Sequence, residues 1–379
     1  MPVVGVIGGG QLARMMQPAA IALGVELRVF AESANSSAHQ AAYRTGDYNN
    51  IAALTEFCDG VDALTFDHEH VPQHLLTALE QSGVKVRPGS SALIHAQNKL
   101  TMRRRLAELG LPMPNWAAAK TAHDIEQFLA ANGPEIVVKT PIGGYDGKGV
   151  RVVSSVSEVG DWLADIAAYG SELLLEQKVG FVGECAQLLA RRPSGEVKSW
   201  SLVRTIQQGG VCSEVIAPFG SSAQQISALE IAQKIAGGLD VVGVLAVELF
   251  ETASGELLIN ELAMRPHNSG HFSIEGSKTS QFEQHLRAVL DLPLGDTDLV
   301  DSAAVMINLL GVDSTNRFSE HYPFAMQDFP EAKFHLYEKE PRAGRKMGHI
   351  TLVGKDPVQL AARGRAAREV LYRGAREAK

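Results

Sequence analysis

The chain has 379 residues, of which 45% are hydrophobic and 21% charged, as expected for a folded protein of two or three domains. A net charge of -8 argues against a general nucleic-acid surface, so any anionic ligand must be held by a local basic cluster. No apolar run approaches the roughly 20 residues of a membrane span, and the first residues lack the basic start of a signal peptide. We therefore expect a cytoplasmic protein without a membrane anchor, and buried packing for Cys58, Cys185 and Cys212, which form no CxxC pair.

The first hundred residues alternate strand and helix patterns. The apolar run 3–9 predicts a buried strand, residues 11–24 a helix ending at Gly24, and residues 25–32 a second strand. Residues 61–70 contain a further strand. This rhythm predicts a parallel, doubly wound sheet.

Two further units follow. A helix is predicted over 98–111, stopped by the sequence LGLPMP, and strands at 135–140 and 171–179 flank a glycine-rich loop. From about Gly183 the chain changes to longer strands and hairpins, and it ends in a helix-like segment rich in Ala and Arg. We expect domains at 1–98, 99–182 and 183–379.

The glycine turn GVIGGGQLA fits the pattern GxGxxA at Gly8, Gly10 and Ala13, with Glu32 at the end of the next strand. Taken alone, this is the fingerprint of dinucleotide-binding proteins. Amides at a helix N-terminus favour any anion, however, so a phosphate or another polar substrate is the preferred interpretation. A purely structural turn is the remaining alternative.

The loop KTPIGGYDGKGV holds four glycines within seven residues, directly after a strand that carries Lys139. Glycines allow a backbone to approach phosphates closely, and a lysine beside them can neutralise their charge. The loop lacks the GxxxxGK[ST] pattern of a Walker A motif. The plain alternative is a hairpin with a glycine-rich tip.

The segment AVELFETASGELLINEL predicts a hairpin that turns at Ser254-Gly255. A two-residue turn there pairs Ala253 with Glu256 and, counting outward, Glu248 with Glu261. Facing carboxylates are tolerated when a cation lies between them, and paired carboxylates with phosphate oxygens suit Mg²⁺. Asn260 adds an oxygen if the backbone bends. Two solvated glutamates are the alternative.

Two polar segments follow the hairpin. RPHNSGHFS gathers Arg265, His267, Asn268, Ser269 and His271, a cluster that is costly to bury without a ligand. Its spacing is poor for zinc, and a surface loop is the alternative. YEKEPRAGRKMGH carries the basic residues expected of an anion clamp: Lys339, Arg342, Arg345, Lys346 and His349. A solvated basic turn would look similar.

Together these motifs resemble the ATP-grasp enzymes. Within that superfamily, GGGQLARM, GGYDGKG, NELAMRPHNSGH and YEKEPRAGRKMGH resemble the 5-(carboxyamino)imidazole ribonucleotide synthases, in family order from residue 5 to about 355. The resemblance implies an α/β protein, α+β in parts, with an N-terminal doubly wound parallel-sheet domain. A small lid domain and a C-terminal mixed-sheet domain would complete the ATP-grasp architecture.

The resemblance also implies a role for particular residues. ATP would be bound by Lys99, Lys139, Gly144, Tyr145, Asp146, Gly147, Lys148, Gly149, Val150, Glu176, Gln177, Lys178, Val179, Glu184, Gln207, Asn260 and Glu261. Mg²⁺ would be held by Glu248 and Glu261. The aminoimidazole ribonucleotide would contact Gln11, Leu12, Glu69, His267, Asn268, Ser269, Lys339, Arg345 and Lys346. Residues acting in the reaction would be Tyr145, Asp146, Arg265 and His271.

The reaction implied is the ATP- and bicarbonate-dependent carboxylation of 5-aminoimidazole ribonucleotide through carboxyphosphate, in purine biosynthesis. A homodimer and a separate mutase that takes over the product are implied as well. This sequence departs from the family at Lys99, usually arginine, at Gln207, a histidine in some members, and in TFDHEHVP, with His68 and His70. Met264 stands where proline is common.

Three alternatives remain open at this point. Another ATP-grasp ligase, such as a formate-dependent glycinamide ribonucleotide transformylase, would share the ATP site but not the basic segment. A nicotinamide-dependent oxidoreductase would rest on the glycine turn and leave the carboxylate hairpin unexplained. A non-catalytic nucleotide sensor is disfavoured by the presence of Lys139, Glu248 and Glu261.

Overall fold

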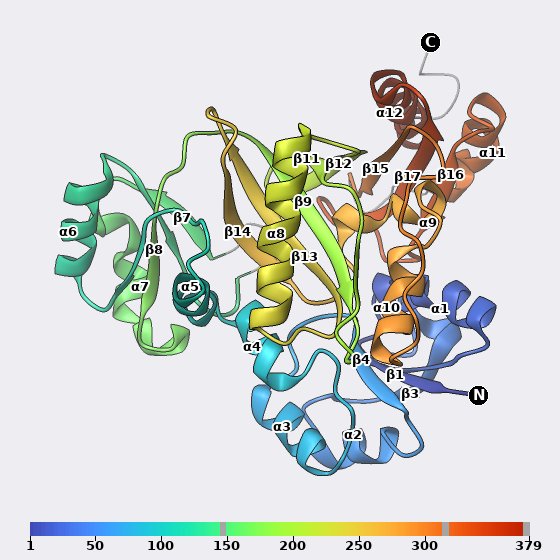
Figure 1. Cartoon of the computed structure of the whole chain (residues 1–379), viewed down its shortest axis with the longest axis horizontal. Coiled ribbons are helices and arrows are strands. Elements are labelled where there is room, and N and C mark those ends of the chain that lie inside the picture. Colours follow the sequence, from blue (N-terminus) through green and yellow to red (C-terminus); the bar gives the residue numbers. More distant parts are fainter. Residues whose placement is uncertain (145–148, 313–317, 374–379) are drawn as a thin grey trace.

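The computed structural model describes residues 1–144, 149–312 and 318–373. Within them the chain builds a parallel sheet at its N-terminus, a small antiparallel sheet and a large antiparallel sheet formed by its second half (Figure 1). None of the helices described there is long and apolar enough to cross a membrane.

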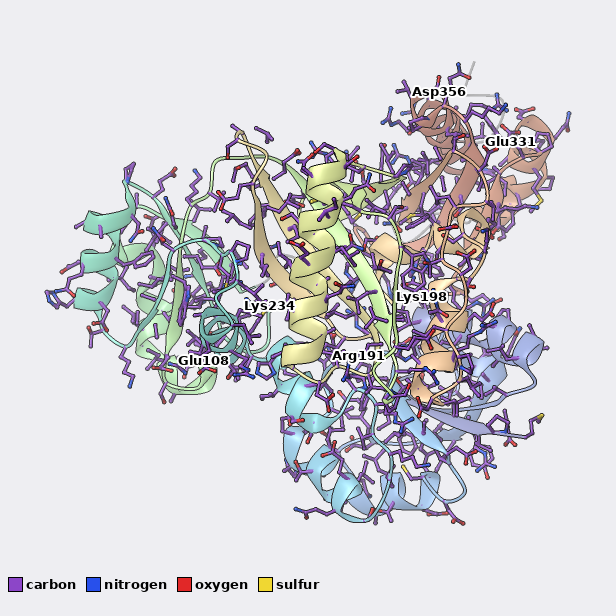
Figure 2. The ribbon with its side chains drawn as sticks, viewed as in Figure 1. Glu108, Arg191, Lys198, Lys234, Glu331 and Asp356 are labelled. Carbon is purple, nitrogen blue, oxygen red and sulfur yellow. The ribbon has the colours of Figure 1, made fainter. Side chains whose placement is uncertain are left out.

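Exposed acidic side chains, Glu331 and Asp356 among them, lie on the outer side of the C-terminal part (Figure 2).

The N-terminal sheet is parallel, as its sequence pattern predicts. Its strand order is β3 (Ala42–Thr45), β2 (Glu26–Ala31), β1 (Val3–Ile7), β4 (Ala63–Phe66). Its helices are η1 (His39–Ala41), α1 (Gln11–Leu23), α2 (Ile51–Phe57), α3 (Gln73–Gln81) and α4 (Ser90–Gln97). Val4 and Val6 pack with α1, whereas Ile7 packs with α2 and α3. Both faces of the sheet are thus covered, which explains the uninterrupted apolar run of β1.

Helix ends in this part follow local signals. α1 stops at Gly24, whose φ of 66° forms a left-handed cap with its N–H on the carbonyls of Ala20 and Ile21, as predicted. α5 (Lys99–Glu108) begins after Asn98, whose side chain accepts from the N–H of Thr101. The start of α5 is thereby set by the sequence itself, and with it the direction of Lys99.

The small sheet has the order β5 (Trp116–Ala119), β8 (Leu173–Gln177), β6 (Ile136–Lys139), β7 (Val150–Val153). The helices of this region are α6 (Ala122–Asn132), α7 (Gly160–Ala164), η2 (Val156–Val159) and η3 (Ile166–Tyr169). Lys139 ends β6 and pairs with Val150 of β7. The glycine-rich loop therefore connects neighbouring strands at the position of the predicted phosphate lysine.

The large sheet has the order β14 (Leu257–Ala263), β13 (Gly243–Thr252), β9 (Phe181–Arg191), β11 (Val203–Gln208), β12 (Val211–Ala217), β15 (Ala303–Leu310), β17 (Lys346–Gly354), β16 (Lys333–Leu336), with β10 (Val197–Ser199) beside β9. Its helices are α8 (Ser222–Gly238), η4 (Asn268–Gly270), α9 (Ser273–Gly276), α10 (Gln281–Val289), α11 (Phe318–Asp328) and α12 (Pro357–Arg373). The strand pairs described here are antiparallel, where the sequence predicts a mixed sheet. Direct connections join β13 to β14, β11 to β12 and β16 to β17, and strands connected in this way pair antiparallel.

Helix α10 joins the N-terminal and large sheets through a buried histidine. The N–H of Val244 on β13 donates to His285 Nδ1 at 3.0 Å, so the ring proton sits on Nε2 and faces Thr65 Oγ1 of β4 at 2.8 Å. Burial lowers the pKa of His285 to about 3. The junction therefore contains a neutral imidazole that makes two specific hydrogen bonds.

The cysteines are free thiols, as predicted. Cys58 and Cys185 are buried among apolar side chains, and burial raises the pKa of each thiol to about 12. Cys212 is half-buried and its Sγ donates to the carbonyl of Glu214 at 3.5 Å. Packing is confirmed as the role of the first two.

Candidate active site

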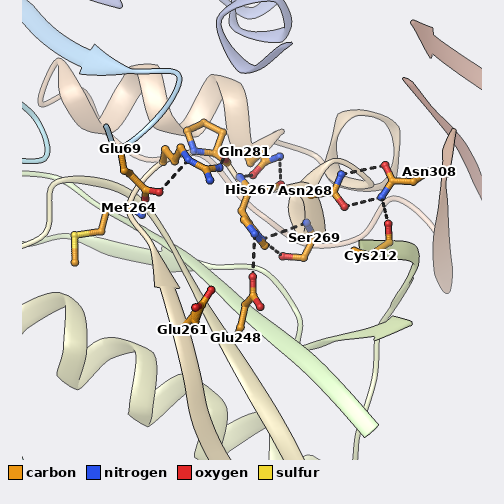
Figure 3. A network of polar contacts seen from close by, with 12 residues as sticks. Glu69, Cys212, Glu248, Glu261, Met264, His267, Asn268, Ser269, Gln281 and Asn308 are labelled. Atoms are coloured by element: carbon orange, nitrogen blue, oxygen red, sulfur yellow. Dashed lines mark hydrogen bonds and ion pairs between the residues drawn. The ribbon is translucent and has the colours of Figure 1, made fainter. Parts of the chain in front are cut away.

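A pair of carboxylates lies on the hairpin of β13 and β14. The turn is one residue longer than predicted, because Thr252 bonds Glu256 around three residues and Gly255 takes a φ of 83°. A bulge then compensates this offset: Asn260 and Glu261 together stand opposite Glu248. The predicted pairing at the tip is therefore wrong, yet the two glutamates do face one another, with both side chains on one side of the hairpin (Figure 3).

Each glutamate has a cationic partner. Glu261 accepts from Lys99 Nζ at 2.7 Å, and Glu248 lies 3.1 Å from His267 Nε2. Burial favours protonation of Glu248, but His267, with Lys346 and Arg265 nearby, outweighs it and lowers the pKa of this carboxyl. Both side chains are about one-third exposed, so their charged oxygens can reach a ligand.

The carboxylates of this hairpin could hold a hard cation such as Mg²⁺ only together with oxygen atoms of a bound ligand. Among residues 1–144, 149–312 and 318–373, no group of three or more His, Cys, Asp or Glu side chains is arranged to hold a metal. Mg²⁺ is typically bound by one or two carboxylates plus substrate phosphates. Glu248 and Glu261 fit that pattern, whereas the side-chain oxygen of Asn260 accepts from Lys139 Nζ at 3.1 Å.

The predicted phosphate lysine lies in a buried charge cluster. Lys139 Nζ is 2.8 Å from Glu176, which also binds Arg103 at 2.6 Å. Burial alone would raise the pKa of Glu176, but the two cations lower it to about 2. The carboxylate of Glu176 is thus bound within this cluster. In the predicted adenine-binding segment 176–179, only Gln177, Lys178 and Val179 lie toward the surface.

Arg103 is the functional candidate that our sequence reasoning missed. It follows Lys99 by four residues in α5, so both lie on one helix face, and this spacing was a usable signal. In the sequence it is the first of three consecutive arginines, and such a run is typical of a solvated basic stretch.

The two ends of the glycine-rich loop are bonded to each other next to Lys139. The N–H of Thr140 donates to the carbonyl of Gly149 at 2.9 Å, and a Cβ on Gly149 would approach Thr140 Oγ1 to 2.4 Å. Glycine is therefore required there. Gly144 and Gly149 flank the segment 145–148, so the predicted roles of Tyr145, Asp146, Gly147 and Lys148 fall outside the described residues, whereas Val150 begins β7.

Glu184 and Gln207, predicted near the nucleotide, are brought together on neighbouring strands. They lie on β9 and β11, and the side chain of Gln207 donates to the carboxylate of Glu184. Burial nevertheless raises the pKa of Glu184, with Glu248 adding to the effect. Glu184 thus belongs to the same region of the sheet as the predicted metal carboxylates.

The loop RPHNSGH is fixed by one buried amide (Figure 3). Gln281 accepts from the N–H of His267 and donates to its carbonyl, both at 2.8 Å. The same Nε2 lies 2.8 Å from His271 Nδ1, so the proton of His271 is on Nε2. His267 Nδ1 is 2.8 Å from Ser269 Oγ, which orients its Nε2 toward Glu248.

Three residues of this loop that were predicted to contact or act on a substrate, Asn268, Ser269 and His271, are buried. His271 is wholly buried, and burial lowers its pKa well below the usual value. Asn268 and Asn308 exchange hydrogen bonds of 3.0 and 2.7 Å, and Ser269 is 1% exposed. Asn268 and Ser269 are thus bonded within the protein and support the loop, whereas Arg265 and His267 are partly exposed.

Predicted substrate residues from both ends of the chain meet beside this loop. Lys339 Nζ donates to Gln11 Oε1, although 328 residues separate them. Glu69 accepts from the N–H of Met264 at 2.6 Å and lies 3.3 Å from Arg265. The side chain of Leu12 is instead buried in the core around α1, so only its backbone can face a ligand.

The other basic residues lie further along the same segment. Arg345 donates to the carbonyl of Glu340 at 3.0 Å, within the connection between β16 and β17. Lys346 begins β17, and its charge contributes to the lowered pKa of Glu248. The basic segment is thereby linked electrostatically to the carboxylate pair.

The glycine turn binds the chain's own carboxylates. Glu32 accepts from the N–H of Gly9 and from His68, each at 3.0 Å, and these bonds lower its pKa to about 2, His68 contributing most. Asp67 accepts from the N–H of Ala13 at 2.8 Å, and a Cβ on Gly10 would come within 1.9 Å of its Oδ2. Two amides of this turn are therefore bonded within the protein, so an external anion stays a prediction for its other amides, and Glu32, the acidic residue of the dinucleotide fingerprint, is already engaged.

Family models match most of the chain. A ribonucleotide synthetase preATP-grasp domain matches residues 1–97, an ATP-grasp domain residues 104–282, and a phosphoribosylaminoimidazole carboxylase C-terminal domain residues 304–363. The N5-carboxyaminoimidazole ribonucleotide synthase of Mycobacterium bovis is 48% identical, covering 98% of this chain and 88% of its own. That of Corynebacterium ammoniagenes is 46% identical, covering 99% and 93%.

Solved structures agree over the whole fold. The N5-carboxyaminoimidazole ribonucleotide synthetase from Thermus thermophilus is 35% identical, with a TM-score of 0.85 over 97% of this chain and 98% of that one. An Aspergillus clavatus N5-carboxyaminoimidazole synthase, in complex with ADP and 5-aminoimidazole ribonucleotide, is 29% identical, with a TM-score of 0.86 and 98% coverage of both chains. The chain therefore belongs to the N5-carboxyaminoimidazole ribonucleotide synthase family of ATP-grasp ligases.

Proposed function

We propose that the protein carboxylates the exocyclic amine of 5-aminoimidazole ribonucleotide, using ATP and bicarbonate, in purine biosynthesis. One observation carries the proposal: the carboxylate pair lies between two cationic clusters. Glu261 contacts Lys99 on the side of the predicted nucleotide site, and Glu248 contacts His267 on the side of the predicted ribonucleotide site. This arrangement suits the transfer of a phosphoryl group toward a second, anionic substrate.

The chemistry follows from this placement. A bicarbonate oxygen attacks the γ-phosphorus of ATP, ADP leaves, and carboxyphosphate forms. The amine nitrogen then attacks the carboxyl carbon, inorganic phosphate leaves, and the nitrogen loses a proton. Carboxyphosphate is short-lived in water, which is why a closing glycine-rich loop, Gly144 to Val150, is useful above it.

We assign the nucleotide side as follows. Lys99 and Lys139 would neutralise the phosphates, Gln177 to Val179 would line the adenine, and Glu184, oriented by Gln207, would bind the ribose. Glu248 and Glu261 would hold Mg²⁺ together with phosphate oxygens, and the ion would supply charge for the developing transition state.

The ribonucleotide side would be formed by the residues that meet around Gln11. Lys339, Arg345 and Lys346 would bind its 5′-phosphate, because bidentate arginine and compact lysine charges are the usual phosphate partners. Arg265, held by Glu69, and His267, held by Ser269, would face the reacting amine.

The direct test is ADP release with Mg-ATP, with each cosubstrate omitted in turn. We expect strong stimulation by 5-aminoimidazole ribonucleotide that requires bicarbonate. Stimulation by formate and glycinamide ribonucleotide instead would favour the transformylase reaction. ADP release that ignores every ribonucleotide would overturn the assigned substrate and leave only the ATP-grasp machinery.

Replacement of Lys339 tests the phosphate pocket. Lys339→Met removes a half-buried cation beside Gln11, so KM for the ribonucleotide should rise about thirtyfold, or about 2 kcal/mol, with little change in KM for ATP. Steady-state kinetics with each substrate varied separately measures the split. Lys333→Met, an exposed lysine on β16, is the matched control. An unchanged KM for the ribonucleotide would remove Lys339 from the pocket.

Three features stay proposals drawn from family membership. We infer a homodimer, a cytoplasmic location and a separate mutase that consumes the product. The domain division at 1–98, 99–182 and 183–379 is proposed on the same basis. Light scattering on the purified protein would test the homodimer, since a single-chain mass at micromolar concentration would contradict it.

A further inference from the structure

Arg103 is a fully buried cation at the start of an arginine run. Its side chain is 0% exposed, whereas that of its neighbour Arg104 is 49% exposed and reaches Glu172. Arg103 Nε lies 2.6 Å from Glu176 Oε1, and its Nη2 donates to the backbone carbonyl of Asn260 at 2.7 Å. A buried charge is costly unless it is paired, so this residue is held there by specific partners.

The partners of Arg103 both belong to the predicted nucleotide site. Glu176 is shared with Lys139, whose Nζ contacts the other carboxylate oxygen at 2.8 Å. Asn260 lies in the bulge that places Glu261 opposite Glu248, and its side chain accepts from Lys139. Arg103 therefore touches the phosphate lysine through Glu176 and the carboxylate hairpin through a backbone carbonyl.

The charge balance of this cluster decides what Lys139 can do. Two cations, Arg103 and Lys139, share one carboxylate, so the cluster carries one net positive charge. Without Arg103, Glu176 would be neutralised by Lys139 alone, and the cluster would be neutral. A buried lysine whose charge is cancelled attracts a phosphate far less strongly. The low effective dielectric constant of a buried site strengthens every electrostatic interaction, so the loss of one charge has a large effect.

We propose that Arg103 is a positioning residue of the ATP site: it neutralises Glu176 so that Lys139 keeps a positive charge for the nucleotide phosphates, and it anchors the bulge that carries Glu261. This inference rests on the nucleotide site of the proposed function. Arginine suits the task because its planar fork bonds two acceptors at once and never loses its charge.

The test compares ADP affinity by calorimetry in EDTA, which leaves out any contribution of a metal ion. Arg103→Met should bind ADP about tenfold more weakly than the wild type. Arg103→Lys loses the fork but retains the charge, which is what acts on the phosphates, and should stay within about threefold. Arg104→Met removes an exposed arginine from the adjacent position and should bind like the wild type. In turnover, KM for ATP should rise in Arg103→Met and return in Arg103→Lys.

A double variant separates charge from folding. Arg103→Met with Glu176→Gln removes both buried partners and restores one net positive charge at Lys139, so ADP affinity should return to within about threefold of the wild type. Circular dichroism establishes that each variant is folded. If Arg103→Met does not fold, the double variant alone decides.

Two results would overturn the inference: wild-type ADP affinity in folded Arg103→Met, or weak ADP binding in a folded double variant. Failure of the nucleotide site on which this inference rests looks different, because the wild-type protein itself would then not bind ADP.

Discussion

Turnover is expected to fall about a thousandfold in Glu261→Gln and in Glu248→Gln, while the fold is retained. Glutamine preserves the shape of each side chain but removes the charge that the transition state of phosphoryl transfer needs nearby. Both side chains are partly exposed on a hairpin whose strands are held by backbone pairing, so the substitutions should not unfold the sheet. ADP release at saturating substrates measures the loss.

A second measurement separates the metal role from a structural one. In EDTA, ADP affinity should be unchanged or tighter in both variants, because each removes a negative charge close to the phosphates. Glu256→Gln, at the exposed tip of the same hairpin, is the matched control and should turn over normally. Near-wild-type turnover in both Glu248→Gln and Glu261→Gln would end the assignment of these carboxylates to a metal.

The free energy of unfolding should fall steeply as the pH drops below about 6.5. His271, His285 and His349 are wholly buried, and burial lowers the pKa of each ring; that of His285 falls to about 3. Below the ordinary histidine pKa the unfolded chain binds protons at these rings, whereas the folded chain does not. The contribution of the neutral rings to the free energy of unfolding is therefore fully present above pH 6.5 and is lost as the pH falls toward each folded-state pKa. Each ring contributes about 1.4 kcal/mol per pH unit, or about 4 kcal/mol per unit together.

Urea unfolding at pH 7, 6 and 5 would measure this slope. His285→Gln keeps an acceptor for Val244 and a donor for Thr65 but cannot be protonated, so it should reduce the slope by about 1.4 kcal/mol per pH unit. His123→Gln, at an exposed position, should leave the slope unchanged. A stability that is flat between pH 7 and 5 would contradict this account.

The elements and the order of the motifs were predictable because their signals are local. Five apolar residues in a row form β1, and Gly24 ends α1 at the predicted position. Period-two counting along the hairpin was enough to place Glu248 opposite Glu261, even though the turn is longer than predicted. It succeeded because the bulge at Asn260 restores the register that the three-residue turn shifts.

The side-chain contacts of the site were harder to predict from the sequence. Gln11 and Lys339 were each predicted to bind substrate, but only the folded chain brings them together across 328 residues. The glycine turn fits an external phosphate in sequence, yet Glu32 and Asp67 already bond the amides of Gly9 and Ala13. His271 was predicted to act in the reaction, and only the folded structure shows that its side chain is wholly buried.

The sequence by itself thus determined the fold class, the order of the sites and the family resemblance, because apolar periodicity, caps and contiguous motifs are properties of neighbouring residues. Only the tertiary structure decided which polar groups face a ligand and which satisfy one another. Arg103 shows why: its spacing from Lys99 indicates a shared helix face, but its burial depends on Glu176 and Asn260, which lie 73 and 157 residues away in the chain. Burial of a charge depends on such distant partners, which local propensity does not encode.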